Sequence, residues 1–222
     1  MKEEWFRGAA WDDEAKTLFE QKIARARDSK PYYLWIKARA IAPHHGADAD
    51  ALFERSLACG DHTETGRALY AWAEGLALRG EYDRALDMLA RCSREYGLFS
   101  SFPMPWAKWD FALLAGVHRM QHRYREARRL LGLHVPSAAF GAQAGLAFML
   151  YDRRRHRAAR KHALLALERA VESGPAFPGL VDVPVTPVTD FPNPIIDRLL
   201  VIAGKWDEQE LGPPPAIWPD KD

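Results

Sequence analysis

The chain has 222 residues and a formal net charge of +1 at pH 7; 48% of its residues are hydrophobic and 27% are charged. This composition is that of a soluble globular protein, and the length suits one large domain or a domain with a tail. A chain of this size buries enough surface to need no disulfide or metal for its stability. The near-zero net charge argues against a domain that is basic throughout.

Three features predict a cytoplasmic protein without membrane association. Cys59 and Cys92 belong to no CxxC or CxxH pattern, which fits two buried thiols in a reducing compartment better than a disulfide framework. The first five residues lack the apolar run of a signal peptide. The longest nearly apolar stretch, 138–151, is too short to span a bilayer and indicates a buried helix.

The first predicted element is a single helix near the N-terminus. Asp12 or Asp13 has the side chain of a helix N-cap, and the pattern that follows predicts a helix to about Arg27. Its expected apolar stripe consists of Leu18, Phe19, Ile23 and Ala26. We expect this helix to cover the first of several helical hairpins.

A helix–turn–helix pattern is clearest around Gly80. Apolar-periodic stretches at 68–78 and 85–92 flank it, and Gly80 can end the first helix in a left-handed conformation. Tyr82 is expected to pack across the turn, and Ala85 is small enough to let two helices approach closely. Similar arrangements occur at 46–51, at 122–127 and at 154–159.

The spacing of these copies predicts a helical repeat. Aligning Ala51, Ala85, Ala127 and Ala159 gives spacings of 34, 42 and 32 residues. A period of about 34 is typical of tetratricopeptide repeats, and the chain resembles that family over 31–172. Trp72-Ala73 stands where the family's Leu-Gly pair would be, and no copy has the full consensus. The regular spacing favours this fold over an irregular helical bundle.

The resemblance implies an all-α superhelix of about four hairpins within a domain spanning 1–172. The repeats are expected at 31–60, 65–97, 106–135 and 138–172, with an insertion in the loop 97–105. From 173 to 222 the chain is a proline-rich extension, because its prolines forbid a continuous helix. Pro194 begins a short predicted helix, 194–203, that would seal the open end of the stack.

Positive charge is concentrated in one part of the chain. Between Val117 and His162 there are eleven Arg or Lys and two acids, a net charge of +9, whereas 163–222 has a net charge of −6. The block could be a solvated turn neutralised by the acidic C-terminal segment, or a surface for an acidic protein; nucleic acid is the less favoured partner. The candidate basic face comprises Arg123, Arg125, Arg153, Arg154, Arg155 and Arg157.

The resemblance also implies a concave groove lined by one face of each first helix. The groove's mixture of aromatic and charged side chains would suit an extended peptide or a partner helix. The matching positions in this chain are Tyr33, Arg67, Tyr70, Glu74, Trp109, Arg119, Phe148 and Asp152.

No motif in the sequence indicates catalysis or a metal site. His118 and His122 have the i, i+4 spacing of zinc ligands, but no Glu follows His118 as in the H-E-x-x-H motif. There is no G-x-S-x-G elbow and no phosphate-binding loop; Gly141 and Gly145 instead indicate close helix packing. We expect no cofactor and no metal.

The sequence therefore favours a non-catalytic scaffold that binds a protein or peptide through the groove. The alternative is a regulatory or immunity-type protein that neutralises an acidic partner through the basic 117–162 face. An enzyme whose site is not visible in the sequence is the third hypothesis, and self-association is left open.

Overall fold

A computed structural model describes residues 5–96, 106–132, 135, 139–170, 194–211 and 213–217. Within these ranges every regular element is helical, which confirms the all-α class. None of the described helices combines the length and the apolar character needed to cross a membrane. The chain forms two compact units, 1–104 and 105–222. The predicted insertion at 97–105 and the prolines between 175 and 192 lie outside the described residues.

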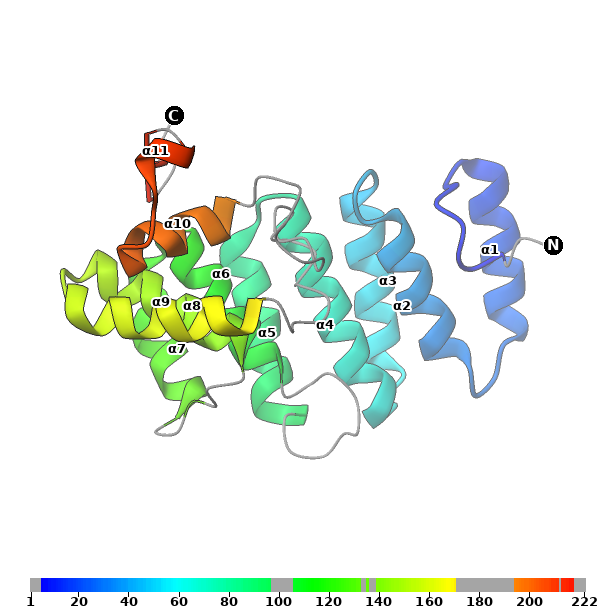
Figure 1. Ribbon diagram of the computed structural model, residues 1–222. Helices are drawn as coiled ribbons and strands as arrows, with labels where there is room; N and C mark the ends of the chain where they lie inside the picture. Colours follow the sequence, from blue (N-terminus) through cyan, green and yellow to red (C-terminus); the bar gives the residue numbers. More distant parts are fainter. Residues whose placement is uncertain are drawn as a thin grey trace. The chain divides into compact units, whose positions relative to one another are not determined.

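Unit 1 consists of one helix followed by two helical hairpins (Figure 1). Its helices are α1 (Asp13–Arg25), α2 (Lys30–Ile41), α3 (Gly46–Ala58), α4 (His62–Leu78) and α5 (Tyr82–Tyr96). Helix α2 pairs with α3 and α4 pairs with α5, while α2 and α3 both pack against α4. Cys92 is buried in α5, but Cys59 at the end of α3 is exposed, so the prediction of two buried thiols is half wrong.

Helix α1 begins and ends almost as predicted. The Asp12 side chain caps it by accepting a hydrogen bond from the Ala15 amide, at 2.8 Å. Phe19 and Ile23 are buried, at 1% and 2% exposure, but Leu18 is 45% exposed and does not belong to the apolar stripe. The stripe is narrower than predicted because Phe19 and Ile23, four residues apart, already cover the face of α1 that packs inward.

Unit 2 is built on two closely packed helices, α6 (Ala107–Val117) and α8 (Phe140–Asp152). A short 3-10 turn, η2 (Gln121–Arg123), leads into α7 (Tyr124–Leu131), which packs on α6; α9 (His156–Ala170) packs on α8. Helix α10 (Pro194–Ala203) coincides with the short helix expected after Pro194 and packs on α9. The last helix is α11 (Glu208–Leu211). Arg198 on α10 donates a 3.2 Å hydrogen bond to the Ile217 carbonyl in the C-terminal tail.

Gly145 brings α6 and α8 into backbone contact. A Cβ atom at Gly145 would lie 2.4 Å from the carbonyl carbon and oxygen of Ala112, so only glycine fits there. At Gly141 the nearest atom, the Trp109 carbonyl oxygen, would be 3.5 Å away, an ordinary contact. The predicted close-packing role is therefore confirmed for Gly145 and not for Gly141.

The second helix of each hairpin has a common pattern of burial. The helices α3, α5, α7 and α9 each have a fully buried alanine as their fourth residue: Ala49, Ala85, Ala127 and Ala159. Ala51, which the sequence alignment used for the first copy, is exposed. The alignment of that copy is therefore wrong by two residues, because Ala49 and Ala51 are both small and only packing against α2 distinguishes them. Gly80 has the predicted left-handed conformation, with φ +77°.

Candidate binding surfaces

The basic segment 153–157 forms the turn between α8 and α9, as predicted. Arg154 adopts a left-handed conformation, with φ +57°, and its amide donates to the Tyr151 carbonyl at 2.9 Å. The Arg155 amide donates to the Leu150 carbonyl at the same distance. The last carbonyls of α8 thus bind the backbone of the turn.

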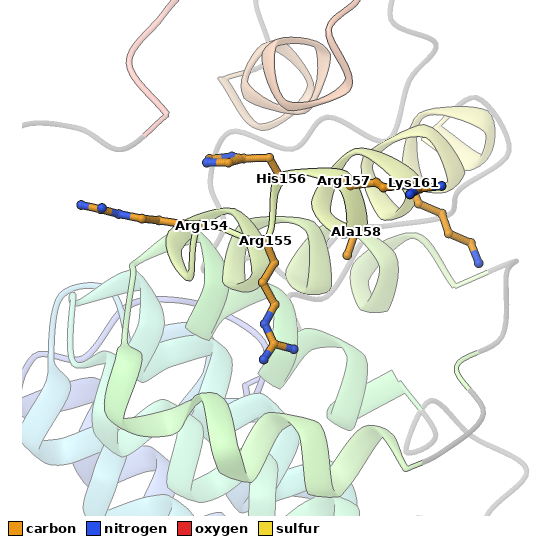
Figure 2. A pocket seen from close by; sticks show the side chains of 6 residues that line it. All are labelled: Arg154, Arg155, His156, Arg157, Ala158 and Lys161. Atoms are coloured by element: carbon orange, nitrogen blue, oxygen red, sulfur yellow. The ribbon is translucent and has the colours of Figure 1, made fainter.

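A shallow depression of about 690 Å³ lies beside this turn and is lined by Arg154, Arg155, His156, Arg157, Ala158 and Lys161. Figure 2 shows that these side chains spread in different directions and do not converge on one point. All six residues are exposed. The depression therefore presents positive charge over a broad area and does not enclose a small molecule.

Five of the six predicted basic-face residues are exposed: Arg125, Arg153, Arg154, Arg155 and Arg157. Arg123 is half-buried and pairs with Glu126 at 3.2 Å. The guanidinium of the exposed Arg153 lies 5.4 Å from the centre of the Tyr124 ring. Those two side chains are engaged within the fold.

Four further exposed cations were missed by the sequence analysis: Arg128, Arg129, Arg160 and Lys161. The repeat register would have identified them, because basic residues occupy the second, fifth and sixth positions of both α7 and α9. We define the basic surface as the eight exposed residues Arg125, Arg128, Arg129, Arg154, Arg155, Arg157, Arg160 and Lys161.

One residue of α7 and one of α9 influence the same histidine of unit 2. His162 on α9 shares a 2.7 Å hydrogen bond with the Gln143 side chain. Burial lowers the pKa of His162, and the nearby charges of Lys161 and Arg128 lower it further. A cation of α7 and a cation of α9 therefore both lie near enough to this imidazole to oppose its protonation.

The two units differ in how their cations are neutralised. Unit 1 contains an extensive set of ion pairs, which join Lys16 to Asp48, Arg39 to Glu74, Arg55 to Glu20, Arg67 to Glu64, Arg79 and Arg84 to both Asp50 and Glu81, and Arg91 to Glu95. In the part of the chain that the structure describes, none of the eight residues of the basic surface takes part in an ion pair.

Four of the predicted groove residues lie in unit 1, and two of them form ion pairs within the unit. Tyr33 packs against the N-terminal rings of Trp5 and Phe6. Arg67 pairs with Glu64 at 2.8 Å. Glu74 is buried and pairs with Arg39 at 2.9 Å. Tyr70 is half-buried.

The other four groove residues lie in unit 2, and two of them offer no surface to a ligand. Phe148 is fully buried and the Asp152 side chain is 1% exposed, so the expectation that they line a groove is not met. Phe148 packs beneath Arg198, whose guanidinium lies 5.2 Å from the ring centre. Arg119 pairs with Asp152 at 2.6 Å, and Trp109 is half-buried.

His118 and His122 do not share a helix face. Helix α6 ends at Val117 and His118 is its C-cap, whereas His122 lies in the 3-10 turn η2. Burial and the charge of Arg198 lower the pKa of His118 to about 4. Among the described residues there is no group of three or more His, Cys, Asp or Glu that could hold a metal ion.

Because the Glu74 carboxyl is buried, we expect the stability of unit 1 to depend on pH. Burial raises the pKa of its carboxyl from 4.5 to about 7, against the opposing effect of Arg39. A raised pKa in the folded state means that stability is lost as the pH rises from about 4.5 through about 7. We expect Glu74→Gln to remove this loss and to raise the free energy of unfolding at pH 8 by about 1–3 kcal/mol.

Urea unfolding at pH 5 and pH 8 measures this difference. Arg39→Gln is the matched control, and it should make the loss at high pH larger because the carboxylate then has no cation beside it. Equal pH dependence in the wild-type protein and in the Glu74→Gln variant would contradict the assignment.

Comparison of the chain with protein-family models, with curated proteins and with solved structures gives no match.

Proposed function

We propose that the chain is a non-catalytic binding module, a stack of tetratricopeptide-like helical hairpins, that recruits an acidic protein through the basic surface of unit 2. One observation carries this proposal. Eight exposed cations gather on α7, on the turn 153–157 and on the start of α9, without an ion pair among the described residues.

Fold stability alone gives no reason for this arrangement. Like charges four residues apart on a helix repel, as Arg125 does Arg129 and as Arg157 does Lys161. The first turn of α9 contains no acidic residue, so the cations there also oppose the helix dipole. An acidic partner would offset both costs on binding, because its carboxylates supply the missing opposite charge.

The surface suits a protein better than a nucleic acid. Proteins that bind single strands combine cations with exposed aromatic rings on which bases stack. Two aromatic residues beside the turn 153–157 are not available for stacking: Tyr124 is 1% exposed, and the half-buried Tyr151 packs edge-on against His156. The predicted groove is the weaker candidate, because the carboxylates of Glu74 and Asp152 are enclosed and already bound.

The test compares two polyanions on the full chain. Fluorescently labelled poly-L-glutamate and a single-stranded oligothymidine of matched charge are titrated with protein, and anisotropy is followed at several salt concentrations. We expect poly-L-glutamate to bind in a salt-dependent manner. Charge reversal by Arg154→Glu, Arg155→Glu and Arg157→Glu together should weaken its binding by roughly tenfold or more.

The control variant carries Lys22→Glu, Arg25→Glu and Arg27→Glu, three exposed cations of unit 1. This variant should bind poly-L-glutamate like the wild-type protein. If both triple variants lost affinity for poly-L-glutamate equally, net charge and not the basic surface would be responsible for the binding. Tighter binding of the oligothymidine would assign the surface to nucleic acid and overturn the proposal.

A further inference from the structure

The N-terminal segment of unit 1 places two aromatic rings on the start of α2. The Trp5 ring centre lies 5.1 Å from that of Tyr33 and 5.4 Å from that of Phe19. The Phe6 ring lies 4.7 Å from Tyr33 and 5.9 Å from Tyr32. Phe6 is 8% exposed. These rings meet at angles between 49° and 62°, the tilted and edge-on geometries that aromatic pairs favour.

The following residues, 8–11, are held in a different way. The buried ammonium group of Lys37 donates to the Gly8 carbonyl at 2.8 Å and to the Ala10 carbonyl at 2.9 Å. The Trp11 indole N–H donates to the Asp48 carboxylate at 2.8 Å. Charge-assisted hydrogen bonds of this kind are strong and directional. Residues 8–11 are thus clamped to α2 and α3.

Residues 5–7 lie beyond this clamp and form a turn, not a helix. Their described contacts are aromatic rings, together with a 3.2 Å hydrogen bond from the Arg7 guanidinium to the exposed Tyr32 hydroxyl. Arg7 also lies over the Phe6 ring, 5.4 Å from its centre. The hydrogen bonds of residues 8–11 therefore keep the N-terminal segment attached to unit 1 whether or not the Trp5 and Phe6 rings are packed on α2.

We propose that the surface formed by Phe19, Tyr32 and Tyr33 is a docking site for a peptide that carries two adjacent aromatic residues followed by a basic residue. The chain's own Trp5-Phe6-Arg7 occupies this site in the structure. A partner with the same pattern would displace it while Lys37 continues to hold residues 8–11.

The reason lies in the chemistry of the occupied surface. Three aromatic side chains from α1 and α2 face two rings, and a tyrosine hydroxyl accepts from the guanidinium that follows them. The chain itself thus shows which ligand the surface accepts. Because the occupant is covalently attached, its effective concentration is high, and the intact chain should bind an added peptide only weakly. This site lies in unit 1 and does not depend on the basic surface of unit 2.

The probe is a labelled peptide with the sequence of residues 3–8, EEWFRG, titrated into the full chain. The double variant Trp5→Ala, Phe6→Ala empties the site in cis. We expect the peptide to bind this variant about tenfold or more tightly than it binds the intact chain. A peptide in which both aromatic residues are alanine should not bind, and adding Tyr33→Ala to the double variant should abolish binding. Leu18→Ala, an exposed side chain of α1, is the matched control and should change nothing.

Circular dichroism checks that each variant is folded. If the double variant unfolds, Trp5→Ala alone replaces it, because that ring is only half-buried and Phe6 remains in place. Binding should then be weaker than in the double variant but still above that of the intact chain. Equal binding to the intact chain and to the variants, or no binding to any of them, would overturn the proposal.

Discussion

Gly145→Ala is expected to destabilise unit 2 by at least about 3 kcal/mol, at or above the usual cost of overpacking a core. The added Cβ would lie 2.4 Å from backbone atoms of Ala112, and backbone cannot move aside as a flexible side chain can. Helix α8 would have to move away from α6. That movement would break the packing of the fully buried Phe111 and Phe148 as well. Chemical unfolding followed by circular dichroism measures the loss.

Gly141→Ala is the matched control, one helical turn earlier on α8. The nearest atom to its new Cβ would be 3.5 Å away, an ordinary contact. Alanine favours a helix over glycine by about 0.5–1 kcal/mol, so this variant should be as stable as the wild-type protein or slightly more so. Equal stability of the two variants would show that α6 and α8 are not as close as described.

Asp152→Asn is the second substitution for which we expect a large effect. The Asp152 carboxylate accepts hydrogen bonds from Arg119 and from Gln121, each at 2.6 Å, and from the Tyr124 hydroxyl at 3.2 Å. It therefore ties the end of α8 to the turn between α6 and α7. Burial, together with the adjacent carboxylate, raises the pKa of Tyr124, so its phenol remains a donor at ordinary pH.

An asparagine side chain has the same shape as aspartate, but it lacks the negative charge of the carboxylate. Its amide nitrogen is a donor and would face one of the three donors that the carboxylate now binds. Removing one partner of a buried charged network costs about 3–5 kcal/mol. The Arg119 side chain is 44% exposed, so water can replace part of the hydrogen bonding that it loses. We therefore expect Asp152→Asn to lower the free energy of unfolding by about 2–3 kcal/mol. Thermal or urea unfolding is the measurement. Glu168→Gln, an exposed acid on α9, is the control and should stay within about 0.5 kcal/mol of the wild-type protein. A similarly small change in Asp152→Asn would refute the role of this carboxylate.

Much of the local structure follows from short stretches of sequence. The cap at Asp12, the left-handed Gly80 and the short helix after Pro194 depend on a few neighbouring residues, and all three were predicted where they occur. The position of the basic turn 153–157 was predicted for the same reason. Backbone sterics and helix capping act within one or two turns of a helix, so a sequence pattern is enough to indicate them.

The errors concern side chains whose surroundings come from distant parts of the chain. Leu18 fits an apolar stripe in sequence yet is exposed, and Ala51 resembles Ala49 until α3 packs on α2. Phe148 and Asp152 were placed on a groove by repeat alignment, but α6, α10 and the turn after α6 cover them. Whether a side chain is buried depends on the element that packs against it, and the sequence of one helix does not contain that partner.

The same distinction applies to the candidate sites. The sequence by itself determined that positive charge is concentrated between 117 and 162, and it determined which residue types are there. Only the tertiary structure decided which of these cations are neutralised: Arg119 and Arg123 pair with acids, while Arg154, Arg155 and Arg157 have no such pair among the described residues. It also placed Trp5 and Phe6 on Tyr33, 27 or more positions away along the chain. The physical reason is that electrostatic and ring–ring interactions depend on distance in space, and folding sets that distance independently of separation in sequence.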